Sequence, residues 1–184
     1  KPRPLVVICD ISGSMERYSR LLLHFMYAVR QSSRYVEAFV FGTRLTRITP
    51  ALKSRDLDAA LSAVSREVVD WSGGTRIGES LKAFNFRYAR RVLRNGAVVV
   101  IISDGWERGD VTLLSREMDR LHRSWLNPLA GAPEYAPLVQ GMRAALPHLD
   151  LFLPLHNLDG IGQLARHLQS DLSLGGGRWP ASKR

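Results

Sequence analysis

The sequence predicts an α/β fold with a doubly wound, mostly parallel central sheet of about six strands, one antiparallel edge strand, and helices on both faces. Two observations lead to this prediction. Unbroken apolar runs at residues 5–9 and 98–102 are typical of strands that are buried on both faces. Between these runs, apolar residues recur every three or four positions, which is the spacing of amphipathic helices.

Each segment of the chain has an expected element. Strands are expected at residues 5–9, 35–41 and 97–103, with a short alternating edge strand at 45–49 that Pro50 ends. Helices are expected at residues 18–33, 56–69, 77–88 and 111–122. A short helix at 138–145, a strand at 149–153 and a helix at 159–172 follow. We therefore expect one domain over residues 1–172 and a disordered tail over residues 173–184, which are rich in glycine and polar residues.

One segment fits this pattern poorly. A parallel strand is expected after the helix at 111–122, yet only Trp125 and Leu126 supply apolar residues before the Asn-Pro pair at 127–128. The segment is several residues too short for such a strand. This shortfall suggests that residues are missing between Ser124 and Trp125, and a truncated strand is the alternative.

Polar side chains follow the first expected strand where it ends. Asp10, Ser12 and Ser14 come directly after the apolar run, and Gly13 permits a tight bend between the two serines. Ligands bind at the carboxyl ends of parallel strands, so three oxygens could converge there. Oxygen donors suit a hard cation, Mg²⁺ first and Mn²⁺ or Ca²⁺ next. Taken alone, the same residues also form ordinary turns.

Two further segments bring oxygens to the same edge of the sheet. Thr75 follows a Ser-Gly-Gly loop and precedes a helix, and Asp104 follows the second buried strand. The alternative role for Thr75 is to cap the helix that follows it.

In order and spacing, these three segments resemble the metal-ion-dependent adhesion site of von Willebrand factor A (VWA) domains. The resemblance implies that the metal ligands are Asp10, Ser12, Ser14, Thr75 and Asp104, some of them acting through water. It also implies that the strands ending in Asp10 and Asp104 are neighbours at the topological switch point of the sheet.

Downstream motifs resemble the CoxE-like branch of VWA proteins in particular. They are Thr75 to Gly78, Asp104 to Gly109, Trp125 to Gly131, Tyr135, Gly141-Met142 and Leu153 to Leu158. This resemblance implies a bacterial, cytoplasmic protein that works with an AAA-type ATPase of the MoxR class. Such pairs mature other proteins, including molybdenum-copper carbon monoxide dehydrogenase. Longer members carry an N-terminal helical region, so this chain is expected to be the VWA portion.

The expected donor set also suggests how a partner would bind. Three of the five donors are neutral hydroxyls, so two carboxylates only balance a divalent ion. Mg²⁺ prefers six ligands and keeps water at open positions, which an Asp or Glu of the ATPase or of a client metalloenzyme could replace. Trp106 and Arg108, which follow Asp104, and His156, which follows the last strand, are expected to form the partner-binding rim.

Composition excludes several other classes of protein. No apolar run approaches the roughly 18 to 20 residues of a membrane span. The single cysteine, Cys9, permits no intramolecular disulfide, and no secretory signal precedes the first strand, which together favour the cytoplasm. The chain has no Gly-rich Lys-Ser/Thr phosphate loop. No histidine lies in the ligand segments, and Glu16 and Glu107 are interpreted as solvated carboxylates, so we do not expect an enzyme.

The chain is basic, with 26 Lys and Arg against 17 Asp and Glu, a formal net charge of +9. Such a balance suits an acidic partner or nucleic acid. The alternative function is therefore a basic nucleic-acid-binding protein of the VWA type. Because the arginines look spread along the chain rather than clustered, ordinary solvated faces are the preferred interpretation.

Overall fold

The structure is a computed structural model that describes residues 4–68, 74–94, 96–121, 123–127 and 139–154. Within these residues one sheet has six strands in the order β3-β2-β1-β4-β5-β6. The strands are β1 Leu5–Asp10, β2 Val36–Phe41, β3 Leu45–Arg47, β4 Val98–Ile102, β5 Arg123–Asn127 and β6 Leu151–Pro154. Only β3, at the edge, is antiparallel to its neighbour. The predicted fold class is confirmed.

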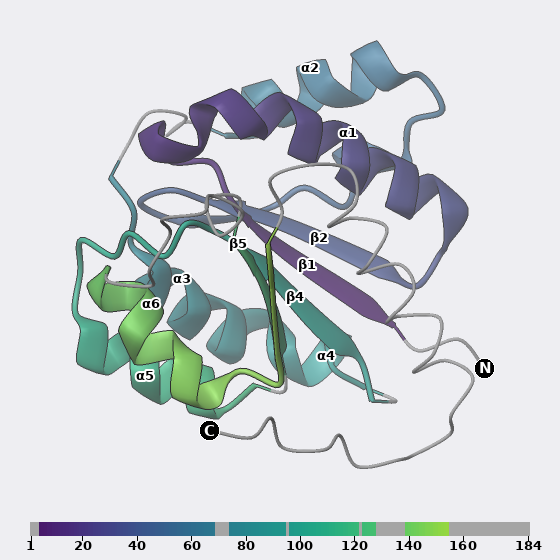
Figure 1. Cartoon of the computed structure of the whole chain (residues 1–184). Coiled ribbons are helices and arrows are strands. Elements are labelled where there is room, and N and C mark those ends of the chain that lie inside the picture. The colour runs from purple at the N-terminus through teal and green to yellow at the C-terminus, as the bar shows by residue number, and fades with distance from the viewer. Residues whose placement is uncertain (1–3, 69–73, 95, 122, 128–138, 155–184) are drawn as a thin grey trace.

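Helices cover both faces of the sheet (Figure 1). On one face lie α1 (Glu16–Ser32) and α2 (Leu57–Glu67), and on the other lie α3 (Ile77–Phe84), α4 (Arg90–Val92), α5 (Val111–Asp119) and α6 (Gln140–Ala145). Alternation along β1 explains why its apolar run is unbroken. Val7 and Cys9 pack on the α1 side, while Val6 and Ile8 pack on the side of α3 and α5.

The helix expected at 77–88 is longer and less regular than its pattern indicates. It continues from α3 through a π-helical turn, Asn85–Ala89, into α4. Phe84 and Tyr88 both pack edge-on against Phe39 of β2, with ring centroids 5.2 and 5.0 Å apart. These contacts fix the buried side of the irregular turn, and its opposite side faces solvent.

Of the two explanations for the short segment before Asn127, the structure has the short strand. A parallel strand, β5, forms from the residues present, with Val99 opposite Arg123 and Ile102 opposite Leu126. The strand pairs with β6 on its other side. The helix before it ends at Asp119 rather than at residue 122, so the chain has room to turn before the strand begins. Five residues are an ordinary strand length.

The helix predicted at 159–172 and the tail predicted at 173–184 lie outside the described residues. Among the helices that the structure describes, none has the length and hydrophobicity that a membrane span requires.

Candidate metal centre

The two candidate carboxylates lie at the carboxyl ends of adjacent strands. Asp10 is the last residue of β1, and Asp104 follows β4 by two positions. β1 and β4 are paired in parallel, with Cys9 opposite Ile102. The chain leaves β1 for α1 on one face of the sheet and leaves β4 for α5 on the other. The prediction that these strands are neighbours at the topological switch point is therefore confirmed.

The Asp10 carboxylate is fully buried and is held through both of its oxygens. The backbone N–H of Ser12 donates to Oδ1 at 2.9 Å, and the Ser103 hydroxyl donates to Oδ2 at 2.7 Å. Ser103 Oγ in turn accepts a hydrogen bond from the N–H of Gly105 at 3.0 Å. These bonds fix the orientation of the carboxylate and leave lone pairs on each oxygen for a cation.

Burial raises the pKa of Asp10 from 3.8 to about 6. Hydrogen bonds from Ser12 and Ser103 favour the ionised form and oppose this rise, while the negative charge on Asp104 adds to it. The two carboxylates are thus close enough to repel each other in a buried place. A cation between them would relieve both the repulsion and the cost of burying charge.

The hydroxyls of Ser12 and Ser14 lie side by side just beyond Asp10. A single 3-10 turn, Gly13–Met15, follows Ser12, and the N–H of Met15 donates to the Ser12 carbonyl at 2.9 Å. This turn brings Ser12 Oγ and Ser14 Oγ to 3.4 Å from each other. Ser12 is buried, whereas Ser14 is exposed. The expected tight turn between β1 and α1 is therefore present and presents two neutral oxygens.

Thr75 is buried and is held in place through its backbone neighbours. The N–H of Arg108 donates to the Thr75 carbonyl at 2.9 Å, and the N–H of Arg76 donates to the carbonyl of Gly42 at 3.0 Å. Thr75 does not cap α3, because the N-cap residue is Arg76. The N–H of Gly78 donates instead to Oε2 of Glu107 at 2.8 Å. The alternative prediction, that Thr75 caps α3, is therefore wrong.

Glu107 is a structural member of the site that the sequence interpretation missed. It is half-buried rather than solvated, and its two oxygens accept from Gly78 N–H and, at 2.6 Å, from Gly109 N–H. It thereby ties the Asp104 loop to the start of α3, next to Thr75. A Cβ on Gly141 would lie 2.8 Å from Cβ of Glu107, so α6 approaches this loop closely. Gly105, with φ of 79°, lets the chain turn there.

Two of the three predicted rim residues are exposed beside these ligand segments. Trp106 is 53% exposed, and its backbone N–H donates to Asp104 Oδ1 at 3.0 Å. Arg108 is exposed, and its Cδ lies 3.4 Å from where a Cβ on Gly74 would be. That Trp106 and Arg108 contact a partner remains a prediction. His156 lies outside the described residues.

The donor set fits a hard divalent cation. Among the described residues there is no group of three or more His, Cys, Asp and Glu side chains that could hold a metal. Two carboxylates and three hydroxyls remain, all of them oxygens, which Mg²⁺, Mn²⁺ and Ca²⁺ prefer over the softer sites that thiolates and imidazoles make.

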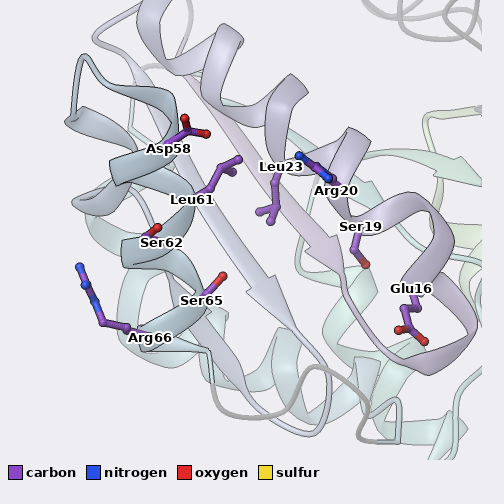
Figure 2. A pocket seen from close by; sticks show the side chains of 9 residues that line it. All are labelled: Glu16, Ser19, Arg20, Leu23, Asp58, Leu61, Ser62, Ser65 and Arg66. Atoms are coloured by element: carbon purple, nitrogen blue, oxygen red, sulfur yellow. The ribbon is translucent and has the colours of Figure 1, made fainter.

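A groove of about 890 Å³ lies between α1 and α2. Figure 2 shows side chains of the two helices along it, with Glu16 toward one end. Two acidic side chains, Glu16 and Asp58, balance two basic ones, Arg20 and Arg66. The buried Ser19 hydroxyl donates within its own helix, to the carbonyl of Met15 at 3.0 Å. The groove thus lacks a pair of buried carboxylates like the one at the ends of β1 and β4.

Comparison with known proteins identifies the family. A family model described as "VWA domain containing CoxE-like protein" matches residues 1–161. The chain belongs to the CoxE-like family of VWA proteins. This confirms the family resemblance seen in the sequence. No match was found among curated proteins.

Solved structures of VWA domains share the fold at low sequence identity. A von Willebrand factor type A protein from Catenulispora acidiphila aligns with a TM-score of 0.61 and 16% identity over 94% of this chain and 42% of its own. The conserved hypothetical protein BatB from Bacteroides thetaiotaomicron aligns with a TM-score of 0.55 and 17% identity over 93% and 98%. Proximal thread matrix protein 1 from the mussel byssus, solved with zinc in its MIDAS motif, gives 0.57 and 13% over 93% and 48%. The chain therefore spans less than half of two of these three.

Proposed function

We propose that this VWA domain binds a partner protein through a divalent cation, and that an acidic residue of the partner completes the metal coordination. The observation that supports this most is the pair of buried carboxylates at the ends of β1 and β4, with the Ser12 and Ser14 hydroxyls 3.4 Å from each other directly after β1. Such a pair is costly to keep ionised without a cation. The donors are too few to fill the six positions that Mg²⁺ prefers, so positions remain for outside ligands.

Each chain segment has a role in this mechanism. Asp10 supplies a carboxylate whose direction Ser12 N–H and the Ser103 hydroxyl set. Asp104, Ser12, Ser14 and Thr75 supply the other oxygens, directly or through water. The bound ion provides an electrophilic position, and the exposed neighbours Trp106 and Arg108 would contact the partner around it.

The proposed ion is Mg²⁺, with Mn²⁺ or Ca²⁺ as the other candidates. The proposed partner is an AAA-type ATPase of the MoxR class, a client metalloenzyme, or both, in the maturation of that enzyme in the cytoplasm. Membership of the CoxE-like family supports this proposal. The domain is proposed to act by binding rather than by catalysis. Glu107, the carboxylate nearest to Asp104 in sequence, accepts two backbone hydrogen bonds, and we propose that its role is to hold the loop.

The test is a capture experiment with two parts. The domain is used as bait in native bacterial lysate with Mg²⁺ or with EDTA, and binding of MgCl₂ to the purified domain is measured by calorimetry. We expect an AAA-type ATPase to be retained only with Mg²⁺. Ser12→Ala should weaken both metal binding and capture, whereas Ser65→Ala, an exposed serine on α2, should change neither. Retention of the ATPase in EDTA, or equal retention by Ser12→Ala, would contradict the metal bridge.

A further inference from the structure

The outer side of the helix that runs from α3 through the π-turn into α4 is densely cationic. Residues 84 and 92 are buried and residue 88 is half-buried, and the side of the helix opposite to them faces solvent. From Lys82 to Arg94, all the exposed side chains on this outward side are basic or aromatic; the exposed Glu79 lies one turn earlier and is paired with Arg76. The exposed ones are Lys82, Phe86, Arg87, Arg90, Arg91 and Arg94.

The four arginines, which we call the Arg87–Arg94 stripe, are Arg87, Arg90, Arg91 and Arg94. Arg87 lies three and four residues before Arg90 and Arg91, so these three lie on one side of the helix, and Arg94 follows two residues after α4 ends. The expectation that arginines are spread rather than clustered is wrong for this helix. Four arginines fall within the eight residues from 87 to 94, and the helix brings Arg87, Arg90 and Arg91 to one side.

Few acidic residues lie near enough to the stripe to neutralise its positive charge. None occurs in the sequence between Glu79 and Asp104. Arg91 lies near enough to Glu37 to lower the pKa of that carboxyl, but the Glu37 oxygens are already bound by Arg47 and Thr49.

The stripe's own contacts also leave its guanidinium groups accessible. The Arg91 guanidinium lies 5.9 Å from the centre of the Tyr88 ring. Arg94 Nε donates to the Arg90 carbonyl at 3.2 Å, which leaves the terminal nitrogens of Arg94 available. The stripe therefore presents several guanidinium groups to solvent.

Phe86 is the second unusual feature of this surface. Its side chain is 88% exposed and belongs to the π-turn, an irregularity that is frequent at functional sites. No other large exposed apolar side chain lies on this helix; the remaining ones in the described part of the chain are Leu21, Tyr35 and Trp106. A single aromatic ring surrounded by arginines differs from the core of a protein–protein interface, which is apolar and poor in charged residues. It does match a stacking platform flanked by phosphate-binding groups.

We propose that Phe86 and the Arg87–Arg94 stripe bind single-stranded nucleic acid, with a base stacked on the ring and phosphates on the guanidinium groups. Arginine suits this role because its planar fork binds phosphate oxygens in pairs. The stripe covers about two helical turns, roughly 10 Å, which is a short segment of a strand. Recognition of this kind does not depend on base sequence.

This surface is independent of the metal centre. α3 begins two residues after Thr75, and α4 ends shortly before β4 starts, so the helix runs from the carboxyl edge of the sheet to the opposite edge. Figure 1 shows α4 at that far end. The sixteen residues from Ile77 to Val92 cover about 24 Å at 1.5 Å per residue. Chelation of the metal should therefore leave nucleic-acid binding unchanged.

The experiment is fluorescence anisotropy with a labelled oligouridine strand and the full chain in EDTA. Four phosphate contacts on a single strand predict that affinity falls about 50-fold when salt rises from about 50 to about 200 mM. The triple variant Arg87→Gln, Arg90→Gln, Arg94→Gln should lose only about threefold over the same range, because one contact remains. Phe86→Ala should weaken binding about fivefold or more.

A matched control has the same change in net charge elsewhere on the surface. Arg20→Gln, Arg34→Gln, Arg55→Gln removes three exposed arginines from other segments and should retain the wild-type salt dependence. Circular dichroism checks that each variant is folded. A labelled poly-glutamate peptide is the competing probe. Failure of oligouridine to bind at low salt, or equal loss in the two triple variants, would overturn the proposal. So would tighter binding of poly-glutamate together with no effect of Phe86→Ala on oligouridine, since the surface would then bind an acidic polypeptide.

Discussion

Replacing Asp10 with Asn tests whether the candidate metal centre is built around a buried charge. Without a bound cation, the pKa of Asp10 is about 6 when folded and 3.8 in the reference state. Because the pKa of Asp10 is higher in the folded protein, its contribution to the free energy of unfolding is fully present below about pH 4. This contribution is lost as the pH rises through about 6. The difference of about 2 pKa units corresponds to roughly 3 kcal/mol.

Part of that gain is offset in the variant. The amide oxygen of the new side chain can still accept from Ser12 N–H, but its NH₂ must donate to the Ser103 hydroxyl, which now accepts instead of donating. We therefore expect Asp10→Asn to be more stable than the wild type by about 2 kcal/mol in EDTA at pH 7.5, or about 4–8 °C in Tm. At pH 4 the two proteins should be equally stable to within about 0.5 kcal/mol.

The assay is urea or thermal unfolding at both pH values, with EDTA or with MgCl₂. Added Mg²⁺ should stabilise the wild type by about 2.7 kcal/mol when its concentration is 100 times the Kd, and should not stabilise Asp10→Asn. The difference in free energy of unfolding between the two proteins should therefore become smaller or change sign when Mg²⁺ is added. If Asp10→Asn is the less stable protein in EDTA at pH 7.5, the carboxylate is not an unfavourable buried charge. The explanation of the centre as a cation site would then lose its main support.

Three further predictions concern the surroundings of the site. Glu107→Ala removes the acceptor of two backbone N–H groups and should lower the free energy of unfolding in urea by about 2 kcal/mol. It should also weaken Mg²⁺ binding, because Glu107 holds the segment next to Thr75. Unchanged stability would show that the two hydrogen bonds do not hold the loop. Gly141→Ala should cost about 1–3 kcal/mol, because the new Cβ would clash with the backbone carbonyl oxygen of Gly105 and would lie 2.8 Å from Cβ of Glu107. Gln140→Ala, on the exposed side of α6, should stay within about 0.5 kcal/mol. Burial raises the pKa of Glu117, but Asn85, Arg120 and Arg116 together bring it below its ordinary value, so its stability is present at neutral pH and is lost as pH falls through the folded pKa. Glu117→Gln should thus destabilise at pH 7 and lose its effect in acid, and an effect independent of pH would contradict this.

Local patterns predicted the central strands because these strands are buried on both faces. The β1 run could be read as a strand since Val7 and Cys9 enter one core and Val6 and Ile8 the other, which leaves no polar position to interrupt it. The polar residues after β1 and β4 were informative for the same reason, since an aspartate directly after such a strand must lie at the edge of the sheet.

The features that the sequence did not reveal depend on contacts between distant segments. Glu107 lies 29 positions from its partner Gly78, and no local spacing marks a carboxylate that caps a helix earlier in the chain. β5 has no continuous apolar run, and its position became clear only from the early end of α5 and its pairing with β4. Ser103 offered one usable signal, a hydroxyl at the end of an apolar strand directly before a candidate ligand.

The candidate metal centre is ordered by hydrogen bonds within the chain itself. Asp10 is oriented by Ser12 and Ser103, and the Thr75 carbonyl is bound by Arg108 N–H. A cation would therefore add charge to an arranged set of oxygens and contribute little to ordering them. Metal dependence of partner binding should then be electrostatic rather than conformational. On this reasoning, chelation abolishes capture at the strand ends without unfolding the domain, and the Arg87–Arg94 stripe at the opposite edge stays available in the same sample.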